Sequence, residues 1–146
     1  AALVRAMIEY WIDDYHDRLI AKLTGQSADP AAAMREYLDF LMAESLALRG
    51  RAFWNYVWSL ADLDADVSAA LTQFMRLYRS LFAMLIRRVN TALSEREALR
   101  LAAALGSMID GIGSVVGEGR PAAADLVGIE AMVKSLAFRI AVEAPR

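Results

Sequence analysis

The sequence of 146 residues contains no cysteine and a single histidine, and these absences exclude several kinds of site. Without cysteine, the chain can form neither a disulfide-stapled fold nor a thiolate metal site. A ferritin-like di-metal bundle needs a Glu-x-x-His motif on each of two helices, and one histidine cannot supply both. His16 has four acidic neighbours, but at helical spacing this cluster is more simply a solvated face, so we expect no metal site; the neighbours are Glu9, Asp13, Asp14 and Asp17.

Motifs of the common catalytic classes are also lacking. The chain has no Gly-x-Ser-x-Gly turn and no glycine-rich phosphate loop between a strand and a helix. We therefore expect no enzymatic activity, no catalytic residues and no cofactor.

The chain has little net charge and no basic patch. Its formal net charge at pH 7 is −2, and its sequence pI is about 5.4. A surface that neutralises nucleic-acid phosphates is basic, so this chain by itself is not expected to bind DNA or RNA.

Long apolar runs are also scarce. The best candidate for a membrane span, residues 101–117, is shorter than the roughly 20 residues that cross a bilayer and has Asp110 in its middle, so we expect no transmembrane helix. No secretion signal is visible from Ala1 onward, and we expect a cytoplasmic protein. The chain enters a helical pattern at Ala1 without a methionine or a capping residue, which leads us to expect a further segment upstream.

Apolar side chains, in contrast, are in excess. They make up 58% of the sequence, against roughly 45–50% in ordinary soluble domains. A chain of this length is expected to form one domain, residues 1–146, and to bury about two-thirds of its unfolded surface. The excess is more than one small monomer hides comfortably, so we expect a homodimer.

The apolar residues recur at helical spacing along almost the whole chain, which predicts an all-α domain of roughly six helices. Gly25 ends the first helix, Asp29-Pro30 starts the second, and Ser94 with Glu97 forms a capping box for the fifth. The expected helices cover residues 1–23, 30–50, 51–61, 65–93, 94–116 and 122–142.

Two of these helices have a narrow ridge of small residues, which suggests close approach of another backbone because each glycine inside a helix costs about 1 kcal/mol. The ridge could serve packing within the chain, but we favour a symmetric four-helix interface built by the last two helices of two copies. The residues predicted to form this interface are Gly106, Ile109, Gly113, Val116, Gly117, Gly128, Ala131, Met132, Ser135 and Leu136.

A set of aromatic side chains from several helices could line a mostly apolar cavity for an apolar or aromatic small molecule. An ordinary hydrophobic core is the alternative interpretation of each of these residues. The residues predicted to bind the ligand are Trp11, Tyr15, Trp54, Trp58, Tyr78, Phe82, Met108 and Asp110.

Asp110 is the most informative single charge because it stands among apolar residues of the fifth helix. A buried carboxylate needs a hydrogen-bonding or cationic partner. The simpler expectation is that Asp110 accepts a structural hydrogen bond from a neighbouring helix; it could also orient a ligand or hold a dimer together.

The residues 52–61 read AFWNYVWSLA and are followed by Ser94-Glu95-Arg96-Glu97, Ala102-Ala103-Ala104-Leu105 and Ile109-Asp110-Gly111. With these segments, and in helix order and length over nearly the whole chain, the sequence resembles the C-terminal regulatory domain of TetR-family transcription regulators, specifically the BetI-like branch. In that family an N-terminal helix-turn-helix domain reads DNA, and the larger helical half dimerises and accepts an inducer.

The resemblance implies that this chain is the effector-binding and dimerisation domain of a repressor. The penultimate and last helices would form the dimer, and DNA would be bound only through an N-terminal domain that this sequence does not contain. A ligand between the first and fifth helices would change the position of the first helix, through contacts such as Trp11 and Tyr15. A stand-alone dimeric carrier or adaptor for an apolar small molecule is the alternative, and the reading frame upstream of Ala1 distinguishes the two.

Overall fold

The computed structural model describes residues 2–25, 27–121 and 123–143. Within these ranges the chain is entirely α-helical apart from one short 3₁₀ turn, and it has no strand, which confirms the all-α prediction. The elements are α1 (Ala2–Thr24), α2 (Pro30–Leu46), α3 (Leu48–Ala61), α4 (Ala65–Val89), α5 (Glu95–Val116), η1 (Ala124–Leu126) and α6 (Ile129–Glu143).

Local capping signals set several helix starts. The Asp29 carboxylate accepts a hydrogen bond from the Ala32 amide at 3.0 Å, directly before Pro30 at the first position of α2. Ser94 and Glu97 form the reciprocal capping box of α5, as predicted. These caps satisfy backbone donors that have no partner inside the helix, and they can be read from the sequence because they involve residues at most three positions apart.

The boundary between α2 and α3 differs from the prediction, because α2 ends at Leu46 and Gly50 lies inside α3. A distant residue determines this break. The amide of Leu48 donates to the Glu118 carboxylate at 3.1 Å, and the amide of Glu118 donates to the carbonyl of Leu46 at 2.8 Å. The loop after α5 thus satisfies backbone groups at the junction, which allows the chain to leave the helix at Ala47.

The last helix also starts later than predicted. Gly128 has a φ of +82°, a left-handed conformation that does not fit inside an α-helix, and α6 begins only at Ile129. The helix α4 ends at Val89 rather than at residue 93, with Asn90 as its cap. The predicted helix starts at Ala1 and Ala122 lie outside the described residues.

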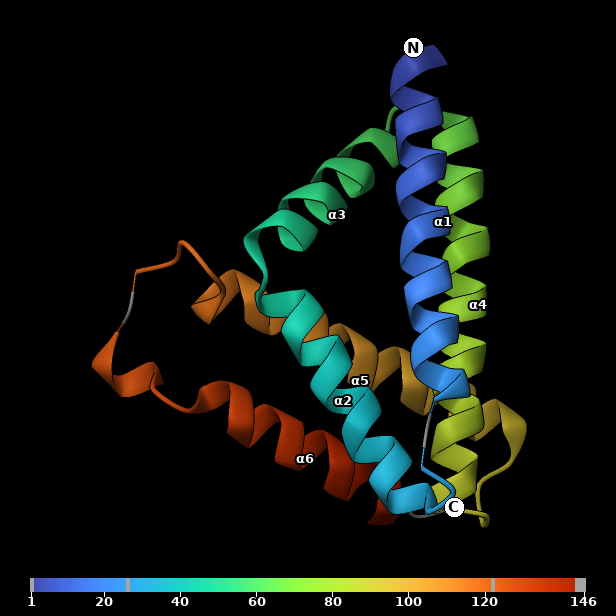
Figure 1. Ribbon diagram of the computed structural model, residues 1–146, viewed down its shortest axis with the longest axis vertical. Helices are drawn as coiled ribbons and strands as arrows, with labels where there is room; N and C mark the ends of the chain where they lie inside the picture. Colours follow the sequence, from blue (N-terminus) through green and yellow to red (C-terminus); the bar gives the residue numbers. More distant parts are fainter. Residues whose placement is uncertain (1, 26, 122, 144–146) are drawn as a thin grey trace.

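Figure 1 shows α1 and α4 lying side by side, with their N-terminal ends at the same end of the molecule. The helix α3 connects the C-terminal end of α2 to the N-terminal end of α4, and α2 belongs to a second group of helices together with α5 and α6. The helix α5 contacts α2 and α6 of this group and also α4, so its inner face lies in the middle of the fold.

Two clusters of apolar side chains hold the helices together. The larger one joins all the helices except α3 through buried residues such as Leu19, Tyr37, Phe82 and Ile109. The smaller one lies between α1, α3 and α4 and contains Ile8, Val57, Val67 and Leu71. The N-terminal half of α1 therefore depends on a much smaller apolar contact than its C-terminal half.

Candidate functional site

A cavity opens between helices α1, α2, α3, α4 and α5. Its volume is about 120 Å³, close to the roughly 150 Å³ of an engineered protein cavity that binds benzene and smaller than the roughly 300–1,000 Å³ of sites for drug-sized ligands. It therefore has room for a ligand with about one ring. The residues that line it are Tyr15, Leu41, Glu44, Ser45, Arg51, Trp54, Asn55, Trp58, Phe74, Met75, Tyr78, Asp110 and Ser114.

One wall of the cavity is a connected set of aromatic rings. Trp54 of α3 stacks on Phe74 of α4 with ring centroids 5.0 Å apart, and Tyr15 of α1 meets the two rings edge-on at 5.4 and 5.5 Å. Tyr78 extends the wall one helical turn along α4, 6.3 Å from Phe74. Edge-on and offset pairs of this kind are favourable, so α1, α3 and α4 meet at a rigid aromatic surface.

The charged side chains in the rest of the cavity lining differ in their hydrogen-bond and ion-pair partners. Glu44 forms an ion pair with Arg18 at 2.6 Å. The buried guanidinium of Arg51 donates to the carbonyls of Leu46, at 3.4 Å, and Glu118, at 2.5 Å. The carboxylate of Asp110 has no hydrogen bond or ion pair with any residue that the structure describes, so the predicted structural hydrogen bond to this side chain is wrong.

The environment of Asp110 disfavours its charge although water can reach it. The residue is exposed at the wall of the cavity, yet the protein atoms around its carboxyl group raise the pKa from 3.8 to about 6 by desolvation alone. Both observations fit a carboxylate in a concave site, which touches solvent on one side and protein on the others.

Three tyrosine hydroxyls share this region with Asp110. Burial raises the pKa of Tyr15, Tyr37 and Tyr78, and the negative charge of Asp110 raises each of them further. The hydroxyls of Tyr37 and Tyr78 are buried and have no hydrogen-bond partner within the described chain. Tyr78 also lines the cavity through its ring, but its hydroxyl is buried and does not reach the open space. The exposed carboxylate of Asp110 is therefore the unpaired polar group that a molecule in the cavity could contact.

The structure brings part of the predicted ligand-binding set together. Tyr15, Trp54, Trp58, Tyr78 and Asp110 all line the cavity.

The other three predicted residues lie elsewhere. Trp11 packs against Phe53 at 5.3 Å and under the guanidinium of Arg49, Phe82 is fully buried against Tyr37, and Met108 packs on the core. These side chains lie on helix faces that do not line the cavity, and the composition of the sequence did not reveal this.

Several lining residues were missed by sequence reasoning. Phe74 and Met75 were not among the predicted ligand-binding residues, and the polar residues gave no local motif. The available signal was the i, i+4 spacing of Phe74 with Tyr78, which places both rings on one face of α4. The missed residues are Leu41, Glu44, Ser45, Arg51, Asn55, Phe74, Met75 and Ser114.

The predicted dimer interface must be corrected on α5. A Cβ atom on Gly113 would lie 2.0 Å from the carbonyl oxygen of Ser45, and one on Gly106 would lie 3.2 Å from the Tyr78 ring. A Cβ on Gly117 would meet the guanidinium of Arg51 at 2.0 Å. These glycines therefore serve close packing inside the chain, which was the alternative interpretation of the ridge.

The remaining interface residues divide by burial. Ile109 is fully buried and Val116 packs on the core, so neither is available as a surface contact. Gly128 precedes α6 and has no atom within 4 Å of a Cβ placed on it; its positive φ explains the glycine. On α6 the predicted residues are exposed, namely Ala131, Met132, Ser135 and Leu136.

In the described part of the chain, no three or more His, Cys, Asp or Glu side chains are grouped so that they could hold a metal ion. By length and composition alone, α5 could cross a membrane, but a core helix meets the same criterion, and the inner face of α5 packs on α2 and α4. Comparison of the chain with known protein families, with curated proteins and with solved structures gives no match.

Proposed function

We propose that this chain is the effector-binding and dimerisation domain of a TetR-like transcription regulator. A small molecule in the cavity would bias the position of α1, which would connect to a DNA-reading domain that this sequence does not contain. The observation that carries the proposal is the cavity itself, because it lies between α1 and the rest of the bundle and has in its wall the carboxylate of Asp110, which no described residue pairs.

The link from the cavity to α1 runs through Tyr15. Its ring forms part of the aromatic wall, where it touches both Trp54 and Phe74. A ligand that packs against this wall changes the contacts of Tyr15 and therefore the free energy of each position of α1. It shifts the equilibrium only by its difference in affinity for the two positions, and a tenfold difference corresponds to about 1.4 kcal/mol.

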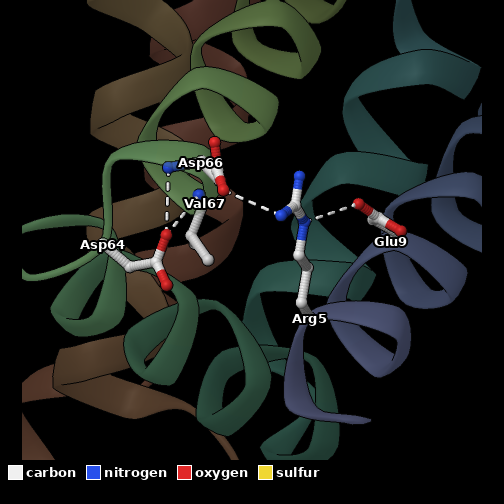
Figure 2. A network of polar contacts seen from close by, with 5 residues as sticks. All are labelled: Arg5, Glu9, Asp64, Asp66 and Val67. Atoms are coloured by element: carbon white, nitrogen blue, oxygen red, sulfur yellow. Dashed lines mark hydrogen bonds and ion pairs between the residues drawn. The ribbon is translucent and has the colours of Figure 1, made fainter. Parts of the chain in front are cut away.

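The N-terminal end of α1 is held loosely enough for such a shift. Figure 2 shows the guanidinium of Arg5 between Glu9 of its own helix and Asp66 at the start of α4. Asp64 caps α4 beside this contact by accepting from the amides of Asp66 and Val67. The Arg5–Asp66 pair is 2.7 Å long but exposed on both sides, and exposed pairs add little to stability because solvent screens them.

The proposed dimer would use the outer faces of α5 and α6. Gly111 and Val115 are exposed on α5, and Met132 and Leu136 are exposed on α6. No atom of the chain lies within 4 Å of a Cβ placed on Gly111, so this part of α5 is open to solvent or to a partner. Apolar side chains exposed on two adjacent helices are the usual composition of a helical interface.

The coding sequence upstream of Ala1 tests the proposal without any structural work. The proposal expects three short helices there, with a Ser/Thr-rich turn and a basic third helix that could enter the major groove. A start codon immediately before Ala1 would contradict it and favour the stand-alone carrier. A mobility-shift assay with the full-length protein and the DNA next to its gene should then show binding that a ligand of the cavity releases.

A further inference from the structure

The unused chemistry of the cavity is the negative charge of Asp110. Glu44 is neutralised by Arg18, and Arg51 is occupied by two carbonyl groups. Asp110 is the lining carboxylate that no described residue pairs. Because Asp110 is exposed at the cavity wall, its unpaired carboxylate is open to a positive charge or a hydrogen-bond donor from outside the chain.

The aromatic wall favours the same kind of group. Tyr15, Trp54, Phe74 and Tyr78 line the cavity together with Asp110. The face of an aromatic ring carries a partial negative charge, and it attracts an ammonium group that lies within about 6 Å of the ring centre. A carboxylate beside aromatic rings therefore selects a cation with an apolar body over an anion of the same shape.

We infer that the cavity binds a protonated amine that is joined by a short tail to a single aromatic ring. The existence of a ligand rests on the proposed function. The ammonium N–H groups donate to the carboxylate of Asp110, which is exposed at the cavity wall. The ring packs against the Trp54–Phe74 stack. The cavity volume of about 120 Å³ limits the ligand to about this size.

The N–H groups matter as well as the charge. A charge-assisted hydrogen bond between an ammonium and a carboxylate is about twice as strong as a neutral one. A quaternary ammonium carries the charge but has no N–H, and it would leave the Asp110 carboxylate without a hydrogen-bond donor. A neutral alcohol supplies one donor without the charge. The site should therefore rank protonated amine, then quaternary ammonium or alcohol, then carboxylate.

Isothermal titration calorimetry of the 146-residue protein at pH 7.5 tests the ranking with four probes that share a phenylethyl body. They are 2-phenylethylamine, trimethyl(2-phenylethyl)ammonium, 2-phenylethanol and 3-phenylpropionate. We expect the amine to bind at least tenfold more tightly than the alcohol or the quaternary ammonium, and the carboxylate to show no binding. Equal binding of amine and alcohol, tighter binding of the carboxylate, or no binding of any probe would overturn the inference. Equal binding of the quaternary ammonium would contradict the part assigned to N–H donors.

Variants locate the effect at Asp110. Asp110→Asn removes the charge but keeps the shape, so the amine should lose at least tenfold in affinity and its advantage over the alcohol. Asp13→Asn makes the same chemical change on the exposed surface of α1 and should alter neither value. An Asp110→Asn protein that is folded by circular dichroism and keeps the amine preference would overturn the inference.

These outcomes are separate from the test of the proposed function. A cavity that prefers the alcohol would refute the amine ligand, whereas release of DNA by that alcohol would still support a regulator. A cavity that binds the amine without any upstream DNA-reading domain would support the ligand class and refute the regulator.

Discussion

The hydroxyl of Ser45 on α2 lies 3.2 Å from the backbone carbonyl of Asp110 on α5 and donates a hydrogen bond to it. The same hydroxyl donates to the carbonyl of Ile109 at 2.8 Å. The backbone at Asp110 is thus held by α2, while its side chain has no partner among the described residues. This combination fixes the position of the carboxylate in the cavity wall without neutralising it.

Ser45→Ala should lower the free energy of unfolding by about 1 kcal/mol, because it removes a partly buried hydrogen bond that joins two helices. Denaturant unfolding measures the loss. Ser107→Ala is the matched control, since the Ser107 hydroxyl is exposed and bonds only to Ala103 of its own helix at 2.8 Å; we expect a change below about 0.5 kcal/mol there. Equal losses for the two variants would argue against the α2–α5 contact.

Asp110→Asn should make the protein more stable at pH 7.5 and leave its stability unchanged near pH 3. The folded-state pKa of Asp110, about 6, lies above its ordinary value of 3.8, so the folded state loses stability as the pH rises from about 3.8 to 6, and the loss stays constant above pH 6. A fully sealed site would give about 3 kcal/mol at 1.36 kcal/mol per pH unit; solvent in the cavity screens the charge, and we expect about 1 kcal/mol.

Unfolding of both proteins between pH 3 and 8 measures this difference. The tyrosines near Asp110 do not titrate in this range, because their pKa values are raised above 10. The ion pair of Glu44 with Arg18 is present in both proteins and cancels in the comparison. A variant that is less stable than the original at pH 7.5 would show that Asp110 has a stabilising partner after all.

Two glycines of α5 should respond in opposite directions to the same substitution. Gly113→Ala places a Cβ 2.0 Å from the Ser45 carbonyl oxygen, so the helices must separate, and we expect a loss of about 2 kcal/mol or more. Gly111→Ala meets no atom within 4 Å and should gain about 0.5–1 kcal/mol from helix propensity. Thermal unfolding compares the two, and a similar loss at both sites would contradict the assignment of inner and outer faces.

A charge on the outer face of α6 should separate the proposed dimer. Met132 is 63% exposed, and Met132→Glu would place an unpaired carboxylate in the interface. Sedimentation velocity should then report a monomer of 16.1 kDa where the original protein reports a dimer. Leu63→Glu is the control, because Leu63 is 86% exposed in the loop after α3, away from α5 and α6. A monomeric original protein would refute the dimer.

The sequence predicted those parts of the fold that depend on neighbouring residues. The caps at Asp29 and Ser94 join residues within one helical turn, and both helix starts were predicted correctly. The break at Ala47 was not predicted, because it depends on Glu118, about 70 residues further along the chain. A hydrogen bond of that kind has no signature in the local sequence.

The cavity was predictable only in its composition. Tyr15, Trp54 and Tyr78 are large and aromatic wherever they lie, so they were candidates from the start. Which ring faces the cavity depends on helix rotation, and Trp11 and Phe82 turn elsewhere. The glycine ridge of α5 was misassigned for a related reason: this helix has small residues on both its inner and its outer face, and the sequence does not say which face is inside.

The central claim is that a ligand in the cavity changes the position of α1, and a distance measurement tests it directly. Because the chain has no cysteine, spin labels can be attached to Met7→Cys on α1 and Ser107→Cys on α5, both at exposed positions. Double electron–electron resonance would be recorded in labelled protein diluted with unlabelled protein, with and without saturating 2-phenylethylamine, its binding checked by calorimetry. The account predicts a shifted or redistributed Met7–Ser107 distance on binding. An unchanged distance in the ligand-bound protein would contradict it and favour a simple carrier.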